Sequence, residues 1–269
     1  MTEPRATLRR MTLAGRVAIV TGGGSGIGRA IALRFAADGA AVSLCGTRRD
    51  PLDATAAEIT RAGGRAIAVV ADISDQAAVA RMVAATVAEL GRPGILVNNA
   101  GIAGPTAAVA DAPAAEWERT LAINLTGAFL CAKHAIPHMV AGGGGRIINI
   151  TSVAGKIGYA LRSAYAASKW GMIGLTRSLA IEVGPQQITV NAIAPGSTRG
   201  ERLSRVIRDR AAALGRPADE VEREFFVDQN AMRRLVEPEE VAATAAFLCS
   251  EEARNITGET IAVSAGFRV

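Results

Sequence analysis

Short apolar segments alternate with longer helical patterns along almost the whole chain of 269 residues. The apolar segments predict seven strands, at residues 16–20, 41–45, 66–71, 94–98, 145–151, 187–193 and 259–263. Strands that alternate with helices form parallel sheets, because each connection carries the chain back to the edge where the previous strand began. Right-handed crossovers then place helices on both faces of the sheet. The pattern predicts an α/β fold with a doubly wound parallel sheet of seven strands.

The composition is sufficient for one large hydrophobic core, since 49% of the residues are hydrophobic and 20% are charged. No linker, low-complexity block or internal repeat divides the sequence. We therefore expect residues 13–269 to form a single domain. Residues 1–12 contain three arginines and are expected to form a mobile tail.

The charge and the hydrophobic runs exclude several partners. The net charge is +5 and the isoelectric point is about 9.6, but the arginines are scattered among acidic residues rather than gathered in a stripe. This distribution argues against nucleic-acid binding. No apolar run approaches the ~18 residues that span a bilayer, and Gly15 and Arg16 interrupt the apolar stretch that a signal peptide would need. We expect a cytoplasmic protein without a membrane partner.

The cysteines and histidines do not form a recognisable metal or disulfide pattern. Cys45, Cys131 and Cys249 are odd in number and widely spaced, which predicts buried core residues. His134 and His138 share a helical face but have no acidic or cysteine companions nearby, so we expect them to be structural and predict no metal site.

A glycine-rich turn follows the first strand and precedes a helical pattern. It is Thr21–Gly28, and its glycines Gly22, Gly26 and Gly28 have the spacing G-x-x-x-G-x-G. A strand, a glycine turn and a helix bring backbone N–H groups and a helix N-terminus against a phosphate. A P-loop is excluded, because no Lys and Ser/Thr follow Gly28. The turn predicts a pyrophosphate site, and a flexible turn without a ligand is the alternative.

Tyr165 and Lys169 lie four residues apart on a predicted helix, so their side chains should point from one face. A free tyrosine has a pKa of about 10, which is too high for a base near neutrality. A fixed cation within a few ångströms favours the phenolate. The pair is therefore suited to proton transfer, although alone it also fits an ordinary surface pair. Ser152, 13 residues before Tyr165, is the third candidate.

Seven segments in this order resemble the short-chain dehydrogenase/reductase family, and the resemblance runs from about Leu13 to Gly266. They are Thr21–Gly28, Ala71–Ile73, Asn98–Gly101, Asn124, Ser152, Tyr165–Lys169 and Pro195–Gly196. The resemblance implies a Rossmann-type fold that binds ligands beyond the carboxyl ends of its strands. It also implies an NAD(P)-dependent oxidoreductase that interconverts a small secondary alcohol and a ketone.

The resemblance implies the cofactor contacts as well. The expected residues are Gly22, Ser25, Gly26, Ile27, Gly28, Thr47, Arg48, Asp72, Ile73, Asn99, Ala100, Gly101, Tyr165, Lys169, Pro195, Gly196 and Thr198. Asp72 and the Ile73 backbone are assigned to the adenine, and Asn99–Gly101 to the adenosine ribose. Relatives usually have a threonine a few residues after Pro195–Gly196, where it contacts the nicotinamide amide. In this chain Gly200 stands near that position, and Thr198 is expected to take over the role of the threonine.

The segment after the second strand bears on the choice of cofactor. Residues 45–49 read Cys-Gly-Thr-Arg-Arg, without a carboxylate to repel a 2′-phosphate. Arg48 or Arg49 could bind that phosphate in a bidentate manner. NADP is therefore favoured. NAD stays possible, because Ser25 stands at a position that is often basic in NADP-preferring relatives.

Hydride transfer requires a proton to reach or leave oxygen as the hydride reaches or leaves carbon. The resemblance assigns that proton transfer to Tyr165 and a hydrogen bond to the substrate oxygen to Ser152. It implies that Lys169 binds the hydroxyls of the nicotinamide ribose and lowers the pKa of Tyr165. It also implies that Asn124 maintains a water path to solvent. For Ser152 the alternative is a hydroxyl bonded to its own backbone.

Two questions of function stay open. A cofactor-binding sensor or scaffold without turnover is the alternative to an enzyme. Within enzymes, a 3-oxoacyl-thioester reductase and a sugar or other polyol dehydrogenase both fit.

The segment 197–234 carries charged helical patterns and is expected to form a lid over the substrate. The C-terminal segment 263–266, which reads Val-Ser-Ala-Gly, departs from the Asp-Gly-Gly that is usual in the family. The helices predicted at residues 121–139 and 164–183 carry apolar residues on more than one face. A partner subunit would cover the second face, so we expect a homotetramer.

Overall fold

The computed structural model describes residues 13–267, so the tail predicted at residues 1–12 lies outside the described residues. Seven strands form one parallel sheet in the order β3-β2-β1-β4-β5-β6-β7. Their bounds are β1 Val17–Thr21, β2 Ala41–Gly46, β3 Arg65–Val70, β4 Ile95–Asn98, β5 Gly145–Ile150, β6 Ile188–Pro195 and β7 Thr260–Val263. The predicted sheet is confirmed, and every strand end lies within two residues of its predicted position.

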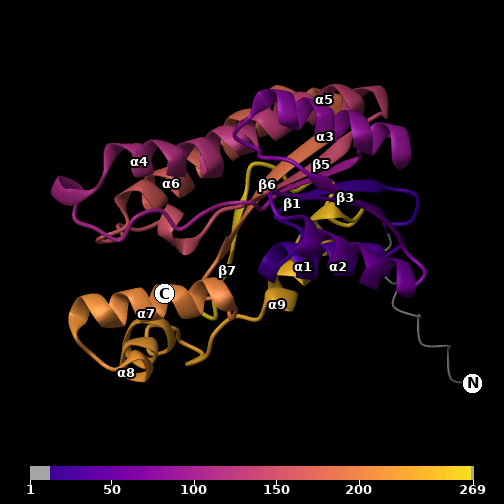
Figure 1. Ribbon diagram of the computed structural model, residues 1–269. Helices are drawn as coiled ribbons and strands as arrows, with labels where there is room; N and C mark the ends of the chain where they lie inside the picture. The colour runs from indigo at the N-terminus through magenta and orange to yellow at the C-terminus, as the bar shows by residue number, and fades with distance from the viewer. Residues whose placement is uncertain (1–12, 268–269) are drawn as a thin grey trace, which may run out of the picture.

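Helices cover both faces of the sheet (Figure 1). One face carries α1 (Gly26–Ala37), α2 (Arg49–Arg61) and α9 (Pro238–Cys249). The opposite face carries α3 (Gln76–Glu89), α5 (Gly127–Ala141) and α6 (Ser163–Val183). Because successive side chains of a strand point to opposite faces, Ala18 and Val20 join the core below α1 and α9. Ile19 joins the core on the other side, with residues of α3 and α5.

The helix α4 (Ala114–Leu121) continues into α5 through one wider turn, the π-helical segment Ala122–Thr126. The sequence predicts a regular helix here, over residues 121–139. The long helix α6 ends at Val183, where Pro185 lacks the N–H that would continue it. This predicted end is confirmed.

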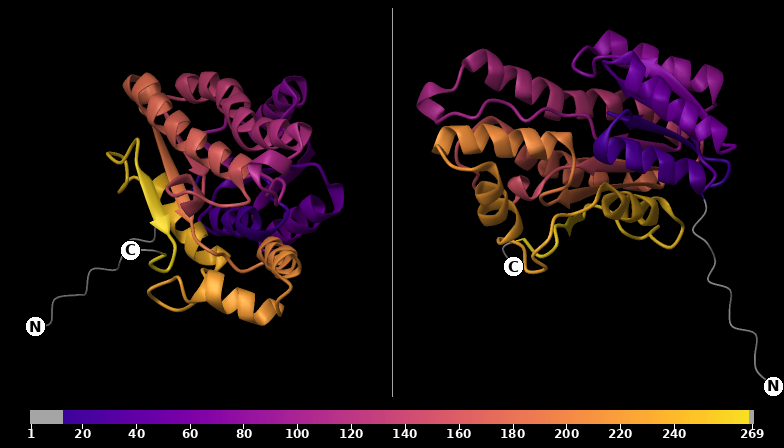
Figure 2. Two further views of the ribbon diagram at one scale, coloured as in Figure 1. Left: turned by 90° about the vertical axis from the view of Figure 1, so that its left-hand side faces the viewer. Right: turned by 60° about the horizontal axis from the view of Figure 1, so that its bottom comes forward.

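The segment predicted as a lid folds into α7 (Glu201–Leu214), α8 (Ala218–Glu222) and a π-helical turn (Arg223–Val227). Figures 1 and 2 show α7 and α8 at one end of the sheet, apart from the helices that cover its faces. The segment has a small core of its own, formed by Ile207, Ala211, Val221, Phe226 and Leu235. A bridge between Thr198 and Val236 closes its base.

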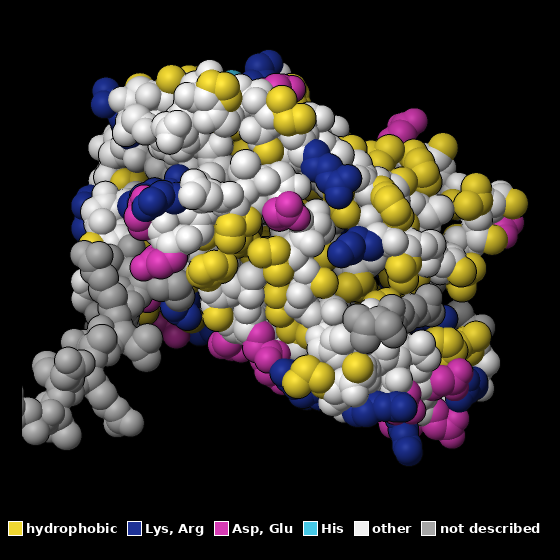
Figure 3. All heavy atoms as spheres, turned by 180° about the vertical axis from the view of Figure 1, so that it is seen from behind, with side chains coloured by type: hydrophobic (Ala, Val, Ile, Leu, Met, Phe, Trp, Pro, Cys, Tyr) yellow, Lys and Arg dark blue, Asp and Glu magenta, His cyan; other side chains and the backbone are white. Residues whose placement is uncertain are grey.

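Acidic and basic side chains are mixed over the lid on the face shown in Figure 3, while hydrophobic groups are spread over the rest of that face. The three cysteines are free and buried, as predicted. Within residues 13–267, no helix combines the length and the apolar character that crossing a bilayer requires.

Candidate active site

The glycine turn brings α1 close to β1 and β4. A side chain at Gly28 would collide with the Gly22 carbonyl and the Asn99 amide. Gly26 has φ +51°, and a Cβ there would meet no atom within 4 Å. Ser25 precedes α1 without capping it by its side chain, and the first turn contains no acidic residue. An uncapped helix N-terminus beside an unobstructed glycine is suited to an anionic group such as a pyrophosphate.

Thr21 and Asn99 hold this turn against the end of β4. The Thr21 hydroxyl accepts hydrogen bonds from the backbone N–H groups of Asn99 and Ala100, both at 3.0 Å. The Asn99 amide donates to the carbonyls of Thr21 at 2.9 Å and Gly22 at 3.3 Å. The Asn99 side chain therefore fixes the shape of the turn from the neighbouring strand.

The two arginines after β2 are in different situations. Arg49 donates to the Ala68 carbonyl at 3.3 Å and lies 3.6 Å from the Asp53 carboxylate. Arg48 is exposed, and in the part of the chain that the structure describes it has no hydrogen-bond or ion-pair partner. Of the two, Arg48 is the one that is available to a phosphate.

Asp72 lies directly after β3 and does not cap the next helix. Its carboxylate accepts from the Ser74 backbone at 2.9 Å and from the Ser74 hydroxyl at 2.7 Å. Asp75 is the N-cap of α3 and accepts from Ala77 at 2.8 Å. Since Asp72 is exposed and the Ile73 side chain is buried, only the backbone of Ile73 is placed to contact a ligand.

Tyr165 and Lys169 lie together near the start of α6. The Lys169 Nζ lies 5.7 Å from the centroid of the Tyr165 ring. It donates to the Ile150 carbonyl at 2.8 Å, at the end of β5, and the Lys169 side chain is buried. Burial lowers the pKa of Lys169 to about 7, and the positive charge of Arg202 acts in the same direction. The ammonium is therefore close to its titration point at neutral pH.

Ser152 follows β5 and begins the short 3₁₀ turn Val153–Gly155. Its hydroxyl oxygen accepts from the Ala154 backbone N–H at 3.1 Å, which is the local bond considered as the alternative role. Because the oxygen is the acceptor in this bond, the hydroxyl proton stays available to a substrate oxygen.

Asn124 lies in the π-helical turn and is completely buried. Its carbonyl oxygen accepts from the Ile102 N–H at 2.7 Å, and its amide nitrogen donates to the Ile102 carbonyl at 3.0 Å. The same nitrogen donates to the Ser168 hydroxyl at 3.0 Å. Asn124 therefore joins the loop after β4 to α6, while the predicted water path stays a prediction.

Pro195 is the last residue of β6, and the Gly196 N–H donates to the Val263 carbonyl at 2.9 Å. The Thr198 hydroxyl donates to the Gly196 carbonyl at 3.1 Å, at the base of the lid. Thr198 thus lies beside the strand end, as its predicted role requires.

Most of the predicted residues meet at one edge of the sheet, because the carboxyl ends of parallel strands lie together. They follow β1 (Gly22 to Gly28), β2 (Thr47, Arg48), β3 (Asp72, Ile73), β4 (Asn99 to Gly101), β5 (Ser152) and β6 (Gly196, Thr198). Tyr165 and Lys169 reach this edge from α6, through the bond of Lys169 to the end of β5.

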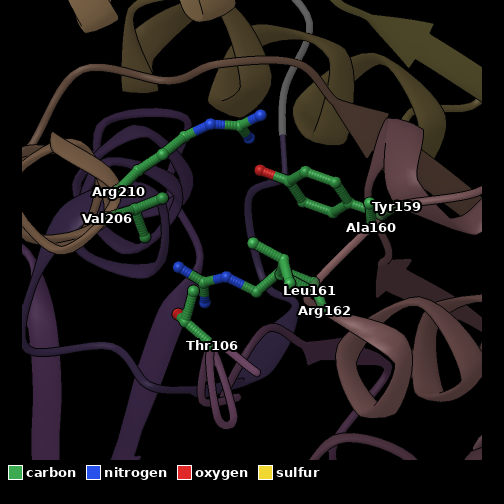
Figure 4. A pocket seen from close by; sticks show the side chains of 7 residues that line it. All are labelled: Thr106, Tyr159, Ala160, Leu161, Arg162, Val206 and Arg210. Atoms are coloured by element: carbon green, nitrogen blue, oxygen red, sulfur yellow. The ribbon is translucent and has the colours of Figure 1, made fainter. Parts of the chain in front are cut away.

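Four polar residues beside this edge were not predicted. Arg202, on α7, donates to the Gly101 carbonyl at 2.7 Å and so brings the lid to the end of β4. Tyr159, Arg162 and Arg210 line a small pocket between α7 and the loop before α6 (Figure 4). The only sequence signal was the spacing of Arg202 and Arg210, which places them on one face of a helix.

Comparisons with known proteins agree with this arrangement. A family model described as enoyl-(acyl carrier protein) reductase matches residues 22–268. Cis-4-hydroxycyclohexanecarboxylate dehydrogenase from Sinomonas cyclohexanicum is 41% identical over 94% of this chain and 96% of its own.

Solved structures are similar as well. NAD⁺-bound xylitol dehydrogenase has a TM-score of 0.91 and 34% identity, over 94% of this chain and 99% of that chain. A variant of actinorhodin polyketide ketoreductase with NADPH has a TM-score of 0.90 and 33% identity, over 94% and 97% of the two chains. The protein is an oxidoreductase, and with this fold, this edge of the sheet and these relatives it belongs to the short-chain dehydrogenase/reductase family.

Proposed function

We propose that the protein interconverts a secondary alcohol and a ketone with NAD(P), and that Tyr165 is its general acid and base. The observation that supports this proposal most is the Tyr165–Lys169 pair at the carboxyl edge of the sheet, with Lys169 tied to the end of β5. Ser152 follows that same strand, so the three groups surround one end of the sheet.

In the oxidising direction, Tyr165 takes the proton of the substrate hydroxyl as the hydride leaves the carbon that bears this hydroxyl. The bound cofactor supplies the hydride acceptor at its nicotinamide ring. Ser152 donates its hydroxyl proton to the substrate oxygen. Lys169 binds the nicotinamide ribose, and its ammonium form favours the phenolate of Tyr165. Asn124 holds the loop after β4 in place and supports a water path.

The cofactor would be held between the N-terminus of α1 and the end of β6. Gly22 to Gly28 would hold the pyrophosphate, Asp72 and Ile73 the adenine, Asn99 to Gly101 the adenosine ribose, and Pro195, Gly196 and Thr198 the nicotinamide. NADP is favoured over NAD because no carboxylate stands at residues 45–49 to repel a 2′-phosphate, and Arg48, which has no partner among the described residues, would be available to bind it together with Thr47. The similar structures do not decide this point, since one contains NADPH and another NAD⁺.

The substrate class is addressed by a panel of alcohols and ketones assayed by nicotinamide absorbance with each cofactor. The panel includes 3-oxoacyl thioesters, polyols and hydroxycyclohexanecarboxylates, because relatives are named for a polyketide ketoreductase, a xylitol dehydrogenase and a cyclohexanecarboxylate dehydrogenase. Turnover of none of these compounds with either cofactor would favour a cofactor-binding sensor instead.

Tyr165→Phe tests the chemistry. The variant should keep its fold and bind the cofactor, since only a hydroxyl is removed, but kcat should fall about 10²- to 10⁴-fold. Stopped assays on the best substrate of the panel measure this fall. Tyr159→Phe changes the only other tyrosine of the chain and should lose much less activity. Near-normal kcat in Tyr165→Phe would reject the acid and base role.

A further inference from the structure

A small pocket lies between the lid and the loop before α6. It is lined by Thr106, Tyr159 to Arg162, Val206 and Arg210. Tyr165 is close enough for its charge to contribute to a raised pKa of Tyr159, so the pocket borders the proposed reaction centre. Figure 4 shows the Tyr159 hydroxyl and the guanidinium groups of Arg162 and Arg210 around the same space.

Arg162 is a buried cation without a counterion. Only 6% of its surface is exposed, and its one hydrogen bond from the guanidinium goes to the Ala103 carbonyl at 3.2 Å. Within residues 13–267, no carboxylate lies within 4.0 Å of it. Leu161, directly before it, has φ +64°, a strained conformation for a leucine. A buried charge without a partner is costly, so a function has to justify this position.

Arg210 reaches the pocket from the lid. It stacks at 4.0 Å over the ring of Phe225, and its charge acts on Tyr159. Burial raises the pKa of Tyr159 above its usual value, although Arg162 and Arg210 both oppose the shift. Tyr159 is therefore neutral at physiological pH and does not balance the two positive charges.

Several other arginines of the lid are paired with carboxylates. Arg216 lies 2.7 Å from Glu224, and Arg233 lies 3.1 Å from Asp228. In the described part of the lid, Arg210 has no such acidic partner. Among the described residues, Arg162 and Arg210 thus place two positive charges without acidic partners at the pocket that borders the proposed reaction centre.

We propose that Arg162 and Arg210 bind a carboxylate of the substrate, so that the reaction interconverts a hydroxy acid and a keto acid. This inference rests on the proposed function and names its substrate class. Two guanidinium groups bind a carboxylate through charge-assisted, bidentate hydrogen bonds. The pocket holds about 10 Å³ of free space, which is room for about one water molecule. The carboxylate therefore enters before α7 reaches the position seen here, and lid closure brings Arg210 to it.

The test compares hydroxycyclohexanecarboxylates with their carboxamides, which are neutral and nearly equal in shape. Wild type should prefer the acid in kcat/KM. In Arg210→Gln the ratio of acid to amide should fall about 10- to 100-fold, as expected for lost hydrogen bonds to a charged group. Arg210→Lys should restore part of the ratio. Arg208→Gln, on the exposed side of α7, should leave the ratio unchanged.

A binding experiment separates this inference from the proposed function. Cyclohexanecarboxylate has no hydroxyl to oxidise, and its titration into wild type and Arg210→Gln by calorimetry reads the subsite without turnover. Binding that depends on Arg210 supports the subsite even if no substrate is oxidised. Equal use of acid and amide by an active wild type overturns the subsite and leaves the oxidoreductase assignment intact. Tighter binding of cyclohexyl phosphate than of the carboxylate also overturns it, in favour of a phosphorylated substrate.

Discussion

At the residue scale, Lys169 shows how burial makes the protonation state of a lysine sensitive to its surroundings near neutral pH. Its ammonium has one backbone acceptor, the Ile150 carbonyl, and is otherwise enclosed by protein. Enclosure disfavours the charged form, and Arg202 adds to the effect. A group with a pKa of about 7 gains or loses its proton in response to a small change in its surroundings.

This shift predicts how stability depends on pH. In the unfolded chain Lys169 binds a proton below its ordinary pKa of 10.5, but in the fold only below about 7. Between these values the unfolded state holds the extra proton, so the free energy of unfolding should rise with pH, by up to about 1.4 kcal/mol per pH unit. Lys169→Met should remove this slope in urea unfolding measured from pH 7 to 9.

The matched control for this experiment is Lys133→Met, which changes an exposed lysine of α5. Its unfolding free energy should follow the wild-type dependence on pH. Parallel curves for wild type and Lys169→Met would show that the lysine is not titrating in this window.

Arg48 carries the residue-scale prediction for the cofactor. Arg48→Ala should weaken NADP binding by about 10-fold or more and leave NAD binding nearly unchanged, because only NADP carries the 2′-phosphate that Arg48 is proposed to bind. Arg49→Ala should have a smaller effect, since Arg49 already contacts Ala68 and Asp53. Calorimetric titration of both cofactors measures the difference. Equal losses for NADP and NAD would contradict the prediction.

At the scale of secondary-structure elements, the sequence was sufficient to predict the features that depend on local sequence patterns. The seven strands and their parallel direction follow from the alternation of strand and helix patterns, and the end of α6 at Gly184-Pro185 follows from the missing proline N–H. The wide turn at Ala122–Thr126 was not predictable, because Asn124 finds its partner at Ile102, which only the fold brings near. The same holds for Arg162 and Arg210, which meet only when the lid packs.

The bonds of Asn124 predict a local effect of its removal. Asn124→Ala leaves the partly buried Ile102 N–H and carbonyl without their partner, at a cost of up to about 1–3 kcal/mol for each group. Amide hydrogen exchange at Ile102 should accelerate more than exchange in the sheet. Asn191→Ala is a matched control, because Asn191 likewise bonds the Ile256 carbonyl at 2.7 Å and the Glu259 N–H at 3.1 Å.

Asn191→Ala should lower overall stability to a similar degree without selectively exposing Ile102. Identical exchange at Ile102 in both variants would mean that Asn124 acts only through global stability.

At the scale of the whole molecule, the helices of one face keep large apolar side chains on their outer side. Trp170 and Ile181 of α6 are 52% and 80% exposed, and Phe129 of α5 is 44% exposed. The inner sides of both helices already pack on the sheet. An outward apolar surface of this kind suits a second copy of the chain, which is the basis for the predicted homotetramer.

Light scattering at micromolar concentration should therefore give a mass near four times the 27.7 kDa of one chain. Ile181→Asp should lower that mass by placing a charge in the subunit contact. Val109→Asp is the control, since Val109 is 74% exposed but belongs to the turn Val109–Asp111 rather than to α5 or α6. A wild-type mass near 27.7 kDa would reject the oligomer.

The separate core of the lid has a consequence for how the protein can diversify. Ile207, Val221 and Phe226 pack with one another rather than with the sheet. Substitutions that reshape the inner side of α7 can therefore accumulate without weakening the half of the molecule that binds the nucleotide. Such a chain can therefore acquire a new substrate selectivity through changes in this one segment.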